Sequence, residues 1–347
     1  MALSAGMDHT CGLTTKRTYC WGFNGYGQLG TSALADSVLT PTGVSGDLTF
    51  AAVVAGTQFT CALSNLGRAY CWGRNFYGNL GITSDSDRWI PTAVASSVTF
   101  RSLAAHEWYA CGVTAAGKAY CWGENYWGQL GDSSVLDRDT PVAVAGGLSF
   151  ASVAVGIHHT CGTTAAGAAY CWGANGYGAL GDSTTTDRLV PTPVAGAHRF
   201  VALAIGWNHT CGLTDAGAAF CWGRDEYGQL GDADTTTKIA PVAVAGGLKF
   251  TSLSVGWDHT CGVRTDGTAY CWGENGSGQL GNGSTSTSVA PVSVAGGLRF
   301  SSLSASQERT CGLATDLTAY CWGVNQYGQV GDGTTTWHLT PTPVERP

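Results

Sequence analysis

The sequence predicts an all-β protein, a seven-bladed β-propeller with three to four antiparallel strands in each blade. Two observations lead to this fold class. The fourteen cysteines recur in pairs with a period of 50 residues, and seven such units fill the 347-residue chain. Each unit is also a series of short strand-like runs separated by glycine-containing turns, with no helical periodicity. We therefore expect residues 1–347 to form one domain, without a linker or tail.

The cysteine pairs define the repeats. The first pair, Cys11 and Cys20, has one residue fewer between its members than the others, which are Cys61 with Cys71, Cys111 with Cys121, Cys161 with Cys171, Cys211 with Cys221, Cys261 with Cys271, and Cys311 with Cys321. Because the spacing does not drift, each unit is expected to have the same strands in the same places.

The unit that begins at Phe150 illustrates the expected strands. Residues 150–156, 160–164 and 168–172 have strand-like composition, and 191–194 could form a short outer strand on which proline is tolerated. Such a small sheet cannot bury both of its faces alone, whereas sheets packed face to face around an axis can. An open β-solenoid and separate small domains are the alternatives. Solenoid coils usually repeat every ~20–30 residues, and no linkers separate these units, so the propeller is favoured.

A recurring motif follows each second cysteine. Residues 121–131 read CWGENYWGQLG, and residues 171–181 read CWGANGYGALG after the pair His159-Thr160. This pattern resembles the repeat of the regulator of chromosome condensation family, and the resemblance extends over all seven units. It implies a seven-bladed β-propeller. The family also includes bacterial secreted propellers, among them the propeller-type β-lactamase inhibitory proteins. This chain differs from the nuclear members in its paired cysteines and in lacking the long insertions that carry their exchange-factor contacts.

Hairpin geometry predicts that the two cysteines of each unit face each other. A three-residue turn at 165–167, with Gly167 in the left-handed position, places Cys161 opposite Cys171 in a non-hydrogen-bonded pair, where Cα atoms lie ~4.5 Å apart. In the first unit a two-residue turn, Thr15-Lys16, keeps Cys11 opposite Cys20. We predict seven intra-blade disulfides in preference to free packed thiols or zinc ligands. Disulfides indicate an oxidising compartment, so we expect a secreted or cell-surface protein, with the periplasm as a further location.

Composition and charge exclude several partners. The chain carries 17 Lys and Arg against 24 Asp and Glu, for a net charge of −7, with only 12% charged residues. Such a chain is poorly suited to nucleic acid or to an anionic membrane surface, and no apolar run is long enough to span a membrane. The N-terminal residues lack the basic and apolar regions of a signal peptide, so we expect the targeting signal to be missing from this sequence. We expect a monomer.

No catalytic or metal constellation is predicted. His9, His159, His209 and His259 occupy one repeated position, but Phe59, Tyr109 and Arg309 occupy it in the other units, which indicates a packing role. The runs Asp132…Asp137-Arg138 and Asp182…Asp187-Arg188 could suggest calcium. Asp232, however, has no second acid, and Asn282 replaces the first acid. An Asp–Arg contact in each turn is the preferred interpretation. The sequence thus predicts no enzyme, no metal and no cofactor.

The candidate function lies where the repeats differ. One variable window separates the first and second strands of each unit, and the other follows the third strand; in an up-down-up blade both lie at the same end. The opposite turns are nearly uniform. Tyr77 and Trp127 occupy a repeated position, so we expect them to be packed. The candidate partner-binding residues are Phe59, Arg74, Phe76, Glu107, Trp108, Glu124, Tyr126, Trp207, Arg224, Glu226, Trp257 and Glu274.

Exposed aromatic side chains interspersed with charges are typical of protein-binding hot spots. We therefore predict a secreted protein-binding module that uses one face of the propeller, with arcs on units two and three and on units five and six. A β-lactamase inhibitor-like protein and a sugar-binding propeller are the alternatives. The sequence leaves open whether Pro341 to Val344 pairs with the first unit, latching the ring, or with its own unit.

Overall fold

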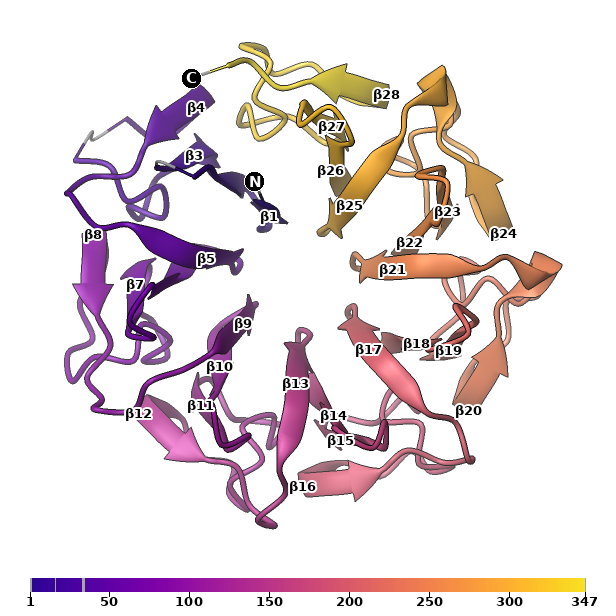
Figure 1. Ribbon diagram of the computed structural model, residues 1–347, viewed down its shortest axis with the longest axis horizontal. Coiled ribbons are helices and arrows are strands. Elements are labelled where there is room, and N and C mark those ends of the chain that lie inside the picture. The colour runs from indigo at the N-terminus through magenta and orange to yellow at the C-terminus, as the bar shows by residue number, and fades with distance from the viewer. Residues whose placement is uncertain (1, 16, 33–34, 347) are drawn as a thin grey trace.

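The computed structural model shows seven four-stranded antiparallel sheets arranged as blades around a central axis (Figure 1). It describes residues 2–15, 17–32 and 35–346. The predicted turn residue Lys16 and the N-terminal Met1 lie outside the described residues. Each blade contains four strands, which decides between the three and four that the sequence allowed.

The four strands of each blade follow one another from the axis to the rim. The first strands line the centre (Figure 1): β1 (Ala2–Ala5), β5 (Phe50–Ala55), β9 (Ser102–His106), β13 (Phe150–Val155), β17 (Phe200–Ile205), β21 (Phe250–Val255) and β25 (Phe300–Ala305). The second strands are β2 (His9–Leu13), β6 (Phe59–Ser64), β10 (Tyr109–Val113), β14 (His159–Thr164), β18 (His209–Thr214), β22 (His259–Arg264) and β26 (Arg309–Ala314).

The third strands carry the Cys-Trp pair and are β3 (Thr18–Phe23), β7 (Ala69–Gly73), β11 (Ala119–Gly123), β15 (Ala169–Gly173), β19 (Ala219–Gly223), β23 (Ala269–Gly273) and β27 (Ala319–Gly323). The outer strands are β4 (Ser37–Gly43), β8 (Arg88–Ala93), β12 (Arg138–Ala143), β16 (Arg188–Pro193), β20 (Lys238–Ala243), β24 (Ser288–Ser293) and β28 (His338–Pro343). Two 3₁₀ turns, η1 (Ala245–Gly247) and η2 (Ala295–Gly297), complete the assignment. None of the described helices is long and apolar enough to cross a membrane.

All fourteen cysteines form the predicted disulfides, one within each blade. The bonded pairs are Cys11 with Cys20, Cys61 with Cys71, Cys111 with Cys121, Cys161 with Cys171, Cys211 with Cys221, Cys261 with Cys271, and Cys311 with Cys321.

The hairpin register explains this pairing. Cys161 and Cys171 are register partners with Cα atoms 4.1 Å apart, and the shortened first hairpin keeps Cys11 opposite Cys20. All fourteen cysteines are completely buried. Because disulfides persist only where thiols are not kept reduced, seven of them indicate an oxidising environment.

Neighbouring blades are joined by a repeated set of hydrogen bonds. Between the first two blades, the carbonyl of Gln28 accepts from the Trp72 indole N–H at 3.0 Å and from the Thr60 hydroxyl at 2.8 Å. His9 Nε2 lies 2.8 Å from the oxygen of that same hydroxyl. The hydroxyl hydrogen is already donated to Gln28, so the imidazole must donate its Nε2 hydrogen. The repeated histidine is thus a packing residue, as the sequence predicts.

The same set of bonds explains one uniform glycine. Gly30 has a positive φ of +67°, and a Cβ there would lie 2.6 Å from the Trp72 indole nitrogen. Any side chain at this position would displace the tryptophan that binds one blade to the next, so glycine is required both by backbone conformation and by contact.

The first and last blades are joined by packing and side-chain hydrogen bonds, without a shared strand in the described part of the chain. β28 pairs with β27 of its own blade, and β1 to β4 form a separate sheet, so none of the described strands is exchanged across the closing seam. Gln329 O in the last blade accepts from the Trp21 indole and the Thr10 hydroxyl in the first. Arg309 also donates to the carbonyls of Gly6 and His9, at 2.9 and 3.0 Å. This settles the alternative that the sequence left open.

Candidate protein-binding face

The two variable windows of each blade lie at the same end of the propeller. Backbone hydrogen bonds join them directly: Arg74 N–H donates to Gln58 O at 2.9 Å, and Arg224 N–H donates to Asn208 O at 2.8 Å. Equivalent bonds occur in the other five blades. We call this end of the molecule the variable face.

Arg74 organises the aromatic side chains of blades two and three. Its guanidinium carbon lies 4.5 Å from the ring centroid of Tyr26, 5.2 Å from that of Phe76 and 5.3 Å from that of Trp108. The guanidinium also donates to the Gln58 side-chain oxygen at 2.7 Å. A cation surrounded by rings is held in one orientation, so this part of the face is preorganised.

An open hollow of about 540 Å³ lies beside this cluster. It is lined by Tyr77, Glu124, Tyr126, Trp127, Val135, Leu136 and Asp137. Tyr126 is 69% exposed, and Val135 and Leu136 are also exposed. The corresponding residues in blade four are Gly176, Thr185 and Thr186, so the apolar lining is specific to blade three. We call this feature the blade-three hollow.

The blade-three hollow has an acidic edge. Glu124 accepts from the Gln129 side chain at 3.2 Å, and Glu107 accepts from the Thr57 hydroxyl at 2.9 Å. Burial, followed by the nearby Glu107 and Asp137, raises the pKa of Glu124 to about 7. Burial likewise raises the pKa of Glu107. Carboxylates in this state gain a great deal from a cationic partner.

Arg224 organises a second cluster on blades four to six. Its guanidinium carbon lies 5.5–5.6 Å from the ring centroids of Tyr177, Trp207 and Tyr227. It forms an ion pair with Glu226 and lies 3.7 Å from Asp258. Arg74 and Arg224 occupy the same position in their repeats. The face therefore carries two similar arginine-centred aromatic clusters.

Trp207 packs on Trp257, with ring centroids 5.6 Å apart, and the Trp207 backbone N–H donates to the Trp257 carbonyl at 3.2 Å. Both rings are half-buried, as is Trp108. A further hollow of about 540 Å³ contacts Trp127, His158, Tyr177, Trp207 and Arg224. The sequence predicts two separate arcs, on units two and three and on units five and six. This hollow lies between them, on blade four, and contacts residues of blades three and five.

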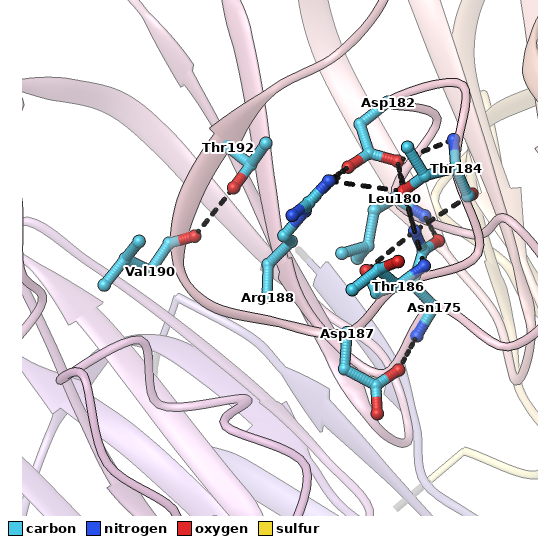
Figure 2. Close-up of polar contacts among 9 residues, drawn as sticks. All are labelled: Asn175, Leu180, Asp182, Thr184, Thr186, Asp187, Arg188, Val190 and Thr192. Carbon is cyan, nitrogen blue, oxygen red and sulfur yellow. Dashed lines mark hydrogen bonds and ion pairs between the residues drawn. The ribbon is translucent and has the colours of Figure 1, made fainter.

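The turn after the third strand has a second part, which Figure 2 shows in blade four. Arg188 binds Asp182 with an N–O distance of 2.7 Å, and Asp187 accepts from the backbone N–H of Asn175 at 2.7 Å. Arg138 and Asp132 repeat the ion pair in blade three. The predicted Asp–Arg contact is therefore confirmed in these two turns.

Two family models match the sequence of this propeller. A family model described as the RCC1-like domain matches residues 1–312, and one for the regulator of chromosome condensation (RCC1) repeat matches residues 318–347. The chain belongs to the RCC1-like domain family. This confirms the resemblance seen in the sequence.

Individual relatives of this RCC1-like propeller match only parts of it in sequence. The probable E3 ubiquitin-protein ligase HERC4 of Rattus norvegicus is 32% identical over 91 residues, 25% of this chain and 9% of that protein. The ultraviolet-B receptor UVR8 of Arabidopsis thaliana is 34% identical over 89 residues, 25% of this chain and 20% of that protein. The matched stretch thus spans at most a fifth of these curated relatives.

Solved structures share the fold. Yeast RCC1 (Prp20), crystallised bound to Kap60, superposes with a TM-score of 0.84 at 21% identity, covering 100% of this chain and 85% of that one. Human WBSCR16 gives 0.83 at 20% identity, covering 91% and 87%. The CRINKLY WD40 ectodomain of the Arabidopsis thaliana receptor kinase ACR4 gives 0.62 at 18% identity, covering 99% and 97%.

One predicted face residue of the RCC1-like propeller is misplaced. Phe59 is 0% exposed and packs in the core against Ala110 of the next blade. It stands where four other blades have histidine, and Ala110 stands where the histidine's threonine partner would be. Phe59 therefore replaces a polar inter-blade contact with an apolar one, and a partner cannot reach it. Glu274 is on the face, but its carboxylate caps the N–H of Gly276.

The sequence also missed residues that the structure exposes. Trp127, Tyr177 and Tyr227 occupy the repeated aromatic position that predicted burial, yet all three are exposed. Val135 and Leu136 are exposed as well, and the sequence did not predict them as binding residues. Their signal was nevertheless present, because this stretch is Thr, Ser or Asp at the same positions of blades two, four, five and six.

Proposed function

We propose that this protein is a secreted or cell-surface binding module, and that it docks a protein partner on the variable face. The observation that carries the proposal is the blade-three hollow. Exposed Tyr126, Val135 and Leu136 line it, and the adjoining Arg74 cluster adds the exposed Phe76 and a fixed arginine, with the partly buried carboxylates of Glu107 and Glu124 nearby. Central aromatic anchors within a polar rim are the usual composition of an interface hot spot.

The chemistry of the hollow specifies the kind of partner. An aliphatic or aromatic side chain would fill the apolar lining, and a lysine or arginine beside it would pair with Glu107 and Glu124. That cation would lower the raised pKa of Glu124, which adds binding free energy. We therefore expect a protein segment in which an apolar residue and a basic residue lie close together.

Differences among the blades favour a protein over a sugar. A lectin-type propeller would repeat one pocket in each blade, whereas the hollow of blade three has Gly and Thr at the matching positions of blade four. Secretion is supported by the seven buried disulfides, which require an oxidising compartment during folding.

The test compares three forms of the protein. Immobilised wild type would be offered extracellular proteins from the source organism, beside Tyr126→Gly with Leu136→Thr, which copies blade four, and beside Leu66→Ser. Leu66 is 82% exposed in the turn between β6 and β7, at the opposite end of the disc. The identified protein would then be purified and titrated against each form, and a panel of β-lactamases would be titrated in parallel.

We expect the wild type and Leu66→Ser to bind the same protein equally, and the blade-three variant to bind it at least ~30-fold more weakly, as for a hot-spot residue. Equal binding by all three forms would contradict docking in the blade-three hollow. A glycan array in which the wild type binds a sugar and the blade-three variant does not would replace the protein partner with a carbohydrate.

A further inference from the structure

One turn of blade five differs from its six counterparts at its centre. The residue four positions after the second cysteine is asparagine in the other blades, namely Asn24, Asn75, Asn125, Asn175, Asn275 and Asn325, but it is Asp225 in blade five. This side chain is fully buried in the described blades and is surrounded by the turn that follows it.

The asparagine acts as a hydrogen-bond donor inside a cage of oxygens (Figure 2). Asn175 Oδ1 accepts from Leu180 N–H at 2.9 Å. Its Nδ2 lies 3.1 Å from Asp182 Oδ1 and 3.1 Å from each of the carbonyl oxygens of Thr184 and Thr186. Asn125 and Asn275 make the same set of contacts. The amide NH₂ group is thus the positive centre of the cage.

Asp225 replaces this donor with an acceptor. Its Oδ1 accepts from Leu230 N–H at 2.8 Å, as the asparagine oxygen does. Its Oδ2, which stands in the place of the amide nitrogen, is completely buried and has no hydrogen-bond partner among the described residues. An unpaired buried carboxylate oxygen is a costly arrangement unless a cation or proton is present.

The backbone of the cage is unchanged in blade five. Ala233 has a φ of 75°, compared with 64° for Ser183, and its N–H donates across to the next blade at 3.0 Å as the N–H of Ser183 does. Asp234 N–H donates to Asp232 Oδ1 at 3.3 Å, as Thr184 N–H donates to Asp182. The carbonyls of Asp234 and Thr236 therefore occupy the places of the two carbonyls that accept from Asn175.

The side chains around the cage add charge. Carboxylate oxygens of Asp225, Asp232 and Asp234 lie within 4.8 Å of one another. Lys238 is their cation, at 2.7 Å from Asp234 and 3.3 Å from Asp232. Two negative charges remain unbalanced, whereas in blade four the Asp182 carboxylate is matched by Arg188.

We propose that the blade-five turn binds a divalent cation, with Asp225 Oδ2, Asp232, Asp234 and the carbonyls of Asp234 and Thr236 as ligands. All of these ligands are oxygens, two of them from the backbone of an irregular turn. Calcium accepts six to eight such ligands in flexible geometry, whereas magnesium requires a near-ideal octahedron. Calcium is therefore the expected ion, and it takes the place that an amide NH₂ group fills in the other blades.

The electrostatics of the three carboxylates support this assignment. Burial is the main cause that raises the pKa of Asp225 to about 7, and the nearby Asp232 and Asp234 raise it further. Three bare carboxylates are therefore unfavourable together. A bound cation would neutralise them without a proton.

The experiment uses calcium alone and needs no protein partner. Wild type freed of metal by chelation would be titrated with CaCl₂ by calorimetry, and its melting temperature would be recorded with and without calcium. We expect one site per chain with a Kd of ~10⁻⁴–10⁻³ M, in the range of extracellular calcium modules, and a calcium-dependent rise in melting temperature.

Two variants copied from other blades serve as controls. Asp225→Asn restores the amide of blade four and should abolish both the binding and the calcium-dependent shift, while melting no lower than the metal-free wild type. Lys238→Ser copies Ser288 of blade six and removes the competing ammonium, so it should bind calcium more tightly. Two results would overturn the proposal: calcium binding by Asp225→Asn that equals the wild type, or the absence of a saturable calcium site in the wild type. The second result would mean that a proton on Asp225, in place of a cation, neutralises the buried carboxylate.

Discussion

The repeated histidines are held in one neutral tautomer by the chemistry of the blade seams. Each threonine hydroxyl donates to a carbonyl of the preceding blade, so His159, His209 and His259 donate from Nε2, as His9 does. In the part of the chain that the structure describes, Nδ1 of His9, His209 and His259 is buried and has no hydrogen-bond partner. Protonation would place a hydrogen on that nitrogen with nothing to accept it.

This arrangement predicts acid lability. Burial lowers the pKa of His9, His159, His209 and His259 to about 3 and that of His106 to about 4. At a pH between 6.5 and these values, the histidines are protonated in the unfolded chain but remain neutral in the folded chain. The contribution of these histidines to stability is therefore complete above pH 6.5 and falls on acidification, by about 1.4 kcal/mol per pH unit for each histidine. Urea unfolding at pH 7.5 and 5.0 measures it.

A matched variant isolates one histidine. His209→Phe with Thr260→Ala copies the Phe59 and Ala110 pair of blades two and three and should remove one histidine's share of the pH slope. Glu124 and Asp225, whose pKa values are both raised to about 7, act in the opposite direction below pH 7 and are unchanged in this variant. An unaltered slope would show that His209 is not the titrating group.

At this scale the sequence predicted residue roles better than residue exposure. The packing role of the histidine position followed from its acceptance of Phe, Tyr and Arg. Exposure was harder to predict because a ring is covered by loops of the adjacent blade. Trp207 is half-buried because Trp257 of the next repeat lies on it, whereas Tyr126 has its ring contact with Trp127 of its own blade and stays open. The cage of blade five was not predicted from the sequence, because the comparison of repeats considered the loop acid Asp232. The residue that distinguishes this blade is Asp225, seven positions earlier.

At the scale of elements, the hairpin is the most predictable part of the fold. Loop length and alternation sufficed to place every cysteine opposite its partner, and the second and third strands were predicted to within one residue in the repeat that begins at Phe150. The outer strand was predicted to start at Pro191 but begins at Arg188. A register shift between Cys171 and Gly173 admits these extra residues, and such a bulge leaves little trace in a sequence.

Each hairpin disulfide closes a short loop, with a sequence separation of 9 or 10 residues. Replacing Cys161 and Cys171 together by Ala should lower the free energy of unfolding by about 2–3 kcal/mol, because the unfolded chain regains loop freedom. Chemical denaturation measures this loss. Cys11→Ala with Cys20→Ala should cost a similar amount, and a loss close to zero at both sites would contradict a stabilising role.

Accessibility gives the hairpins a second measurable property. All fourteen cysteines are 0% exposed, so a reductant should reach them only after the blades separate. We expect dithiothreitol to leave the intact mass unchanged under native conditions and to add 14 hydrogens, two for each of the seven bridges, only in denaturant. Rapid reduction of the native protein would show that the hairpins open individually.

At the scale of the whole molecule, the closing seam adds one arginine to the tryptophan and threonine contacts of the other seams. Arg309 is buried and bridges the last blade to the carbonyls of Gly6 and His9. Arg309→Ala removes the donor to Gly6 O and one of the two donors to His9 O, which still accepts from Gly6 N–H at 2.9 Å, and it should cost ~2–4 kcal/mol. Arg309→His copies the seams on the other side of the ring and should cost less. Thermal and urea unfolding compare the two variants, and an equal loss would mean that an imidazole replaces none of the contribution of the guanidinium at this position.

Truncation tests the way in which the ring is closed. The last strand, β28, has β27 of its own sheet as its strand partner among the described residues and lies at the rim, and its Leu339 carbonyl also accepts from Gly283 N–H of blade six at 2.9 Å (Figure 1). Removing residues 341–347 should therefore fray the edge of the seventh blade and leave the other blades protected in hydrogen exchange. Loss of protection in the first blade would instead indicate a latch between the two ends.

Because every sheet is built from one continuous stretch of chain, the blade is a self-contained cassette. The closing seam uses the same tryptophan, threonine and carbonyl contacts as the others. A 50-residue segment could therefore be exchanged for another repeat as long as its seam partners match, with Phe59 requiring Ala110 and His209 requiring Thr260. Recombination of whole repeats would then rearrange the binding surface while the supporting ring is conserved, so that new recognition could arise by shuffling blades as well as by changing single residues.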